Sequence, residues 1–212
     1  MFPQSFRCLI AFLLALPIVA SISGAQAAAV PHEIGGFSIG SDVSSYGEKV
    51  LARTALPVRY AEFITEVEVQ APEGFKTGIV AYGSCAYPGK ILRLKFKYTN
   101  DSREFFEELV RRMKARFGQK PEWRGDPFQN VMAWKWSFRD TEGKRITLLV
   151  QHNQVDTDER IGNTVKLTWV DAVEQERSCD ERKHPEGNRP KDAKKRAATT
   201  MNVSEWDVLM PK

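Results

Sequence analysis

Apolar and polar residues alternate along several segments of the chain, and this period of two is typical of strands that bury one face. In the clearest segment, residues 91–98, four apolar or aromatic residues alternate with Arg93, Lys95 and Lys97. Turn-forming Pro, Gly and Asp residues separate these segments. The alternation predicts strands over 58–70, 76–84, 91–98, 134–138, 145–152 and 164–170.

One segment has its apolar residues at helical spacing instead, and this spacing predicts a helix over 102–117. Asn100, Asp101 and Ser102 offer side chains that cap a helix start, and Gly118 is the residue expected just after a helix end. The apolar stripe of this helix consists of Phe105, Phe106, Leu109, Val110, Met113 and Phe117.

These elements together predict an α+β fold. Short turns between the strands favour an antiparallel meander of about five to six strands, with the 102–117 helix packed on one face. Short flanking helices are expected over 43–54 and 171–181. The alternation leaves the other face of the sheet in water, and no internal repeat is evident.

The first 27 residues have the pattern of an export signal. Arg7 precedes an uncharged apolar run over 8–20, and Ala25-Gln26-Ala27 matches the small-residue motif at which signal peptides are cleaved. The run is shorter than the roughly 20 residues that span a bilayer. We therefore expect a cleaved signal over 1–27 and a periplasmic or secreted protein without a later transmembrane segment; an uncleaved anchor is the competing interpretation.

The cysteine count fits an oxidising compartment. Cys8 lies within the signal, so the mature chain keeps only Cys85 and Cys179. An even number of cysteines in an exported protein predicts a disulfide between them, against the alternative of two unpaired thiols. No C-x-x-C motif indicates zinc binding or redox catalysis.

Charge and composition divide the rest of the chain. The whole sequence has a formal charge of +4, yet residues 28–181 are nearly neutral, with 22 bases and 23 acids. We expect a single globular domain over 28–181, a basic disordered linker over 182–200 and a C-terminal segment over 201–212 that docks on the domain or on a partner. Because the basicity lies in the linker, it gives no indication of a nucleic-acid-binding domain.

The outward side of the predicted sheet is rich in basic residues. An open basic face can bind an envelope protein, an anionic glycan or a lipid headgroup, although such faces also serve solubility alone. The candidate anionic-ligand face consists of Arg93, Lys95, Lys97, Lys135, Arg139 and Lys166.

Other groupings give weaker signals. Glu62, Glu66 and Glu68 share one strand face, where two carboxylates could hydrolyse a glycoside but more often form a solvated edge. Tryptophans on the alternating strands are expected in the core, whereas Trp123 in a loop is expected to be exposed. An acidic loop resembles a calcium site only partly and is better explained as a polar hairpin loop; it contains Asn153, Asp156, Asp158, Glu159 and Asn163.

No catalytic or cofactor motif is evident, and no histidine spacing indicates a metal site. The leading hypothesis is therefore an exported, non-enzymatic envelope or secreted protein that binds another envelope component. The alternative is a hydrolase of cell-wall or extracellular glycan whose acids converge only in the fold. A third option is a small-ligand carrier with an apolar cavity beneath Phe105, Phe106 and Trp134.

Overall fold

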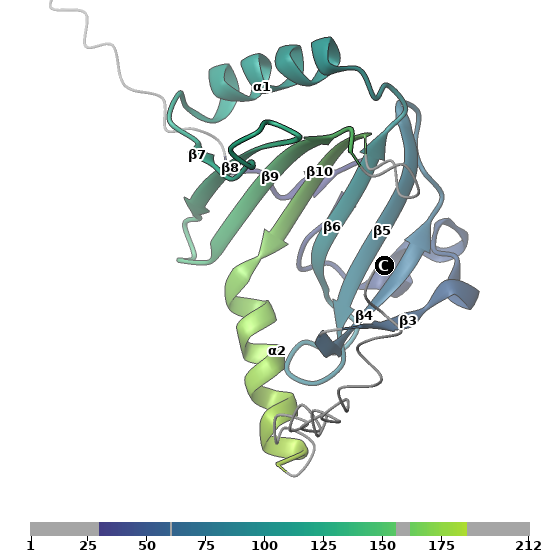
Figure 1. Cartoon of the computed structure of the whole chain (residues 1–212). Helices are drawn as coiled ribbons and strands as arrows, with labels where there is room; N and C mark the ends of the chain where they lie inside the picture. Colours follow the sequence, from purple (N-terminus) through teal and green to yellow (C-terminus); the bar gives the residue numbers. More distant parts are fainter. Residues whose placement is uncertain (1–29, 60, 156–161, 186–212) are drawn as a thin grey trace, which may run out of the picture.

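A computed structural model describes residues 30–59, 61–155 and 162–185 (Figure 1). Its main feature is an eight-stranded antiparallel sheet with the order β3-β4-β5-β6-β10-β9-β8-β7, beside a separate ribbon of β1 and β2. The predicted α+β class is confirmed. The strands are β1 (Glu33–Ile34), β2 (Phe37–Ser38), β3 (Leu56–Val58), β4 (Ala61–Val69), β5 (Phe75–Gly83), β6 (Ile91–Tyr98), β7 (Glu122–Trp123), β8 (Val131–Arg139), β9 (Arg145–Asn153) and β10 (Gly162–Trp169).

The sheet consists of two halves with the same order of elements. Strands β3 to β6 lead into helix α1 (Arg103–Phe117), and strands β7 to β10 lead into helix α2 (Val170–Lys183). The last strands of the two halves, β6 and β10, pair at the centre of the sheet. The chain therefore does not follow a simple meander, and its repeat lies in topology without any visible repeat in sequence.

Helix α1 follows the predicted bounds closely. Ser102 caps its start, with the Ser102 hydroxyl accepting a hydrogen bond from the Phe105 backbone N–H at 3.2 Å. Gly118 ends it with a φ of 105°, a backbone conformation that favours glycine. Phe106 and Val110 of α1 are buried in the core, and Leu109, Met113 and Phe117 pack against it while partly buried.

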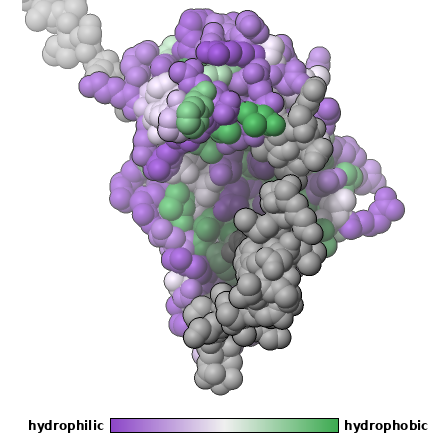
Figure 2. Space-filling model, in the orientation of Figure 1, coloured by the Kyte–Doolittle hydropathy of each residue, from purple (hydrophilic) through white to green (hydrophobic). Residues whose placement is uncertain are grey.

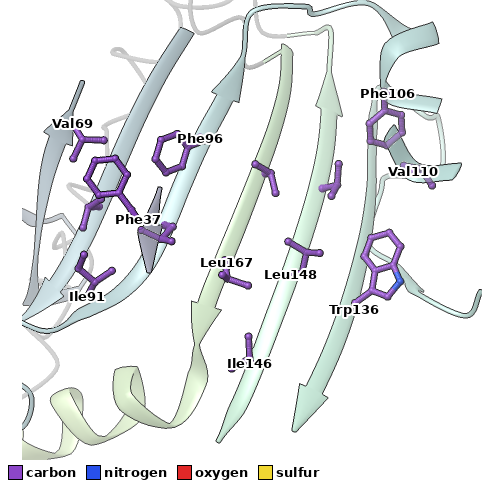
Figure 3. Close-up of a cluster of buried hydrophobic side chains, with 14 of the residues drawn as sticks. Phe37, Val69, Ile91, Phe96, Phe106, Val110, Trp136, Ile146, Leu148 and Leu167 are labelled. Atoms are coloured by element: carbon purple, nitrogen blue, oxygen red, sulfur yellow. The ribbon is translucent and has the colours of Figure 1, made fainter. Parts of the chain in front are cut away.

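One face of the sheet is covered and carries the core (Figure 3). Helix α1 covers the β8–β9 half, where Phe106 stacks on His152 with ring centroids 5.5 Å apart. The segment before β3 covers the β4–β6 half, where Phe37 packs against Phe96. Leu148 and Leu167 lie between these two covers and are almost fully buried.

The N-terminal cover differs from the helix predicted over 43–54. It forms two short 3-10 turns, η1 (Val43–Lys49) and η2 (Ala52–Thr54), instead of one α-helix. Gly47 breaks the first with a φ of 52° and a ψ of −129°, and Val50 then pairs with Val69 as an isolated bridge. Asp42 caps the start of η1, since its carboxylate accepts a hydrogen bond from the Ser44 backbone N–H.

The sheet has eight strands rather than five to six because two edge strands were too short to predict. Strand β3 has three residues and β7 has two, which is too few for a period of two to be recognised. Three predicted regions lie wholly or partly outside the described residues. These are the signal (1–27), the C-terminal segment (201–212) and the part of the linker (182–200) beyond residue 185. No helix in the described ranges is long and apolar enough to cross a bilayer.

Two contacts fasten α2 to the loop after β5. Glu176 is fully buried, and its carboxylate accepts hydrogen bonds from the backbone N–H groups of Ser84, Cys85 and Tyr87. One turn further along α2, Cys179 forms a disulfide with Cys85 across a sequence separation of 94 residues. The predicted disulfide is therefore present, and we call this arrangement the α2 clip.

Glu176→Gln should destabilise the fold by about 2–3 kcal/mol, because a buried carboxylate that accepts three N–H groups is replaced by an amide that also carries donors. Glu174→Gln is the matched control, since Glu174 is half exposed and pairs with Arg145 at the surface; it should change stability by less than about 1 kcal/mol. Guanidinium unfolding curves measure both. Equal effects of the two variants would show that the buried carboxylate has no special role.

Loss of the disulfide should lower the free energy of unfolding by about 4–5 kcal/mol, because a cross-link over a separation of 94 residues restricts the unfolded chain. Cys85→Ser/Cys179→Ser and the reduced wild-type protein should unfold at the same denaturant concentration. A variant as stable as the oxidised protein would contradict this prediction.

Candidate functional site

The pairing of strands places all six predicted basic residues on the same, open face of the sheet. Arg93, Lys95 and Lys97 alternate with core residues along β6, and Lys166 on β10 lies directly opposite Lys95. Lys135 and Arg139 of β8 join this face through the intervening strand β9. Figures 1 and 2 view this face; the part that the grey atoms of Figure 2 leave visible is mostly hydrophilic, with hydrophobic residues in its hollowed middle.

Several of these basic groups are engaged within the protein. Lys135 Nζ lies 3.8 Å from a carboxylate oxygen of Glu122. Arg93 Nη1 lies 3.9 Å from Glu66. Arg139 Nη1 donates a hydrogen bond of 2.8 Å to the Gly143 carbonyl. The six residues thus share a face but do not form one uniform site.

Lys95 and Lys166 form the centre of this face. They are directly opposed across the β6–β10 pair, and neither has a carboxylate within ion-pair distance among the described residues. Like charges at directly opposite positions destabilise a sheet. Ile79 flanks Lys95 and Leu149 flanks Lys166 in the same cross-strand row. The pair is therefore two cations between apolar neighbours.

The surroundings of Lys166 disfavour its charge. Burial of the ammonium lowers the pKa of Lys166 below its usual 10.5, and repulsion by Arg93 and Lys95 lowers it further. Glu66 opposes this shift only weakly. The Arg93 Nε is also buried and has no hydrogen-bond partner among the described residues. An anion placed among these three side chains would relieve repulsion and supply the missing acceptor.

A second hollow lies on the covered side, between α1 and the β7–β8 edge. It is a groove of about 460 Å³. It matches in part the cavity predicted beneath Phe105, Phe106 and Trp134, because Phe106 and Trp134 line it but Phe105 does not. We call it the α1 groove; its lining residues are Phe106, Glu107, Val110, Arg111, Lys114, Trp123, Gln129, Met132 and Trp134.

The tryptophans match the prediction in part, because Trp134 is only partly buried and Trp123 lies in the edge strand β7 rather than in a loop. Trp136 and Trp169 are buried in the core, whereas Trp123 is 40% exposed at the sheet edge. Trp123 meets Trp134 edge to face, with ring centroids 4.9 Å apart. An exposed indole beside a groove provides apolar contact area that a ligand can cover.

The weaker sequence signals do not form sites of their own, and Glu66 and Glu68 lie on the same sheet face as the basic residues. Glu66 is occupied by Arg93 rather than facing a second carboxylate across a cleft. His152 is buried, and its Nδ1 hydrogen-bonds the Asn163 side chain at 2.7 Å. Asn163 also donates to the Ser102 carbonyl, so this pair joins β9 and β10 to the start of α1. Residues Asp156, Asp158 and Glu159 of the acidic loop lie outside the described residues.

Sequence reasoning missed the role of Glu176 and the polar rim of the α1 groove. Glu176 lies three positions before Cys179, the spacing that puts two residues on the same side of a helix. That spacing was a usable signal once the disulfide was predicted. Lys114 and Gln129 carry no comparable signal, because their neighbourhood depends on how α1 crosses the sheet. Comparison of the chain with protein-family models, curated proteins and solved structures finds no match in any of the three.

Lys166→Met should stabilise the fold at pH 7 by about 0.5–1 kcal/mol, because it removes a half-buried charge opposite Lys95. The folded-state pKa of Lys166 is lowered, so the unfolded chain binds more protons between that pKa and 10.5, and wild-type stability rises with pH across this window. The gain of the variant should therefore shrink at alkaline pH. Lys135→Met, which breaks the pair with Glu122, should show no gain in the same urea titrations; a gain as large as that of Lys166→Met would contradict the assignment.

Proposed function

We propose that this chain is an exported, non-enzymatic binding protein whose open sheet face holds an anionic group of another envelope component. The observation that carries the proposal is the opposed Lys95–Lys166 pair, which has no carboxylate partner in the described structure. A protein that served only solubility would gain by separating these charges or pairing them with acids. Retaining them at the centre of the face favours an external anion as their partner.

The proposed location outside the cytosol rests on two independent features. The Cys85–Cys179 disulfide forms in oxidising compartments and is rare in the reducing cytosol. The signal predicted over residues 1–27 supplies a route to such a compartment. Together they favour a periplasmic or secreted protein.

The neighbours of the lysine pair indicate the chemistry of the anion. Arg93, Lys95 and Lys166 offer several donors to a compact group such as phosphate or carboxylate. Ile79 and Leu149 on either side favour an anion attached to an apolar body over a fully hydrated ion. Phospholipid headgroups and anionic glycans both carry such groups, and the apolar flanks favour the lipid.

Lys95→Gln/Lys166→Gln should weaken binding of the full-length protein to phosphatidylglycerol-containing vesicles by about 30-fold, since each lysine contributes about 1 kcal/mol near an anionic surface. Sedimentation with these vesicles, with pure phosphatidylcholine vesicles and with dextran sulfate measures the effect. Binding of the wild type should fall as salt rises, because it is electrostatic.

Lys135→Gln is the matched control on the same face, and it should weaken vesicle binding far less because Lys135 already lies 3.8 Å from the Glu122 carboxylate, which Arg124 shares. All variants keep the basic 182–196 segment, so any difference between them belongs to the sheet face. Equal loss in the control and the double variant, or no loss in either, would reject the proposed site. Loss of dextran sulfate binding without loss of vesicle binding would identify the anion as a glycan group.

A further inference from the structure

We infer that the α1 groove binds a single-chain amphiphile, with the acyl chain on its aromatic floor and an anionic head at Lys114. This inference goes beyond the proposed function, because the groove is on the other side of the sheet from Lys95 and Lys166. Trp134 pairs with the core residue Val150, whereas the next residue along β8, Lys135, faces the open side. Ligand binding at the α1 groove and at the Lys95–Lys166 pair can therefore be tested independently.

The floor of the groove is apolar and formed by two elements. Phe106 and Val110 project from α1 toward β8 (Figure 3). Met132 and Trp134 face them from β8, and Trp123 of β7 extends the floor to the sheet edge. A groove of about 460 Å³ is within the range of small-molecule sites, whose walls are mostly apolar with a few placed polar groups.

The polar rim offers one cation without a carboxylate partner among the described residues. Arg111 is held by Glu108, with its Nε and Nη2 donating at 2.7 and 2.6 Å, although Arg112 shares this carboxylate. Glu107 is likewise held by Arg103 at 2.9 Å.

Lys114 differs from these residues, because its Nζ lies over the Trp134 ring, 4.4 Å from the centroid, with no ion pair in the described structure. An anionic head at Lys114 would therefore complement the charge of the groove while its chain covers the aromatic floor.

The α1 groove has too few free polar side chains to suit a sugar ligand. A pyranose ring needs several hydrogen-bond partners around its rim, but Glu107 and Arg111 are already engaged. Lys114 and Gln129 remain as the side chains free to bind a ligand's polar group among the lining residues that the structure describes. One or two polar contacts over a large apolar floor suit an amphiphile better than a glycan.

The outer wall of the groove is pre-formed. Asp126 accepts hydrogen bonds from the backbone N–H groups of Phe128 and Val131, and these bonds lower the pKa of the Asp126 carboxyl. Gly125 lies so close to Trp123 that a Cβ there would be 2.3 Å from the indole ring. The loop therefore holds Trp123 and Gln129 in place before any ligand arrives, which lowers the entropy cost of binding.

Dodecanoate, dodecanol and chitotriose are the probes that test this inference, with intrinsic tryptophan fluorescence of the oxidised full-length protein as the readout. Dodecanoate should change the fluorescence saturably below its micelle concentration. Lys114→Ala should weaken dodecanoate binding about tenfold and leave dodecanol binding unchanged, because only the head contact is lost. Trp123→Ala should weaken both by about tenfold, as a tryptophan face is removed from the floor.

Matched controls lie next to the groove. Arg112→Ala changes an exposed cation of α1 outside the lining, and Phe128→Ala removes an exposed aromatic residue of the same loop; neither should alter dodecanoate binding by more than about twofold. Binding of chitotriose without dodecanoate would overturn the inference in favour of a glycan. Absence of saturable dodecanoate binding, or equal loss in controls and lining variants, would also overturn it. Lys95→Gln/Lys166→Gln should bind dodecanoate normally, which keeps this test separate from that of the open face.

Discussion

Pairing between β6 and β10 is the contact on which the rest of the structure depends. It joins two four-stranded halves that otherwise have no shared strand pair, and it places Leu94 against Leu167 in the core. On the opposite face the same register forces Lys95 against Lys166. Stability on one side and unfavourable electrostatics on the other thus come from a single alignment, because side chains alternate between the faces of a strand.

The α2 clip reinforces that alignment from outside the sheet. Helix α2 continues directly from β10, while the loop it grips lies between β5 and β6. Glu176 and the disulfide therefore connect the two halves next to the strands that join them. The buried Glu176 carboxylate also provides acceptors for three backbone N–H groups of this loop, which would otherwise be costly to bury without partners.

The local pattern of apolar and polar residues was sufficient to predict much of this fold. Residues 91–98 were predicted to the residue, and α1 to within one residue, because both have strong periodicity and clear end signals. Local pattern could not predict that β10 lies beside β6, since that depends on contacts between residues far apart in sequence. Six basic residues could therefore be assigned to a face, but the opposed pair among them could not be identified. Gly47 misled the helix prediction, because its positive φ breaks an otherwise helical spacing of apolar residues.

The strand order also constrains how the polypeptide matures as it is made. Until β10 is synthesised, one edge of β6 has unpaired backbone hydrogen-bonding groups and carries Leu94 and Phe96. Such an edge promotes aggregation with other unfolded chains. Among the described strands, β10 is synthesised last and is the strand that pairs with this edge, and Cys179 follows ten residues after its end at Trp169. The Cys85–Cys179 disulfide can therefore form only after nearly the whole domain has been synthesised. It stabilises a sheet that has already formed and does not direct the pairing of its strands.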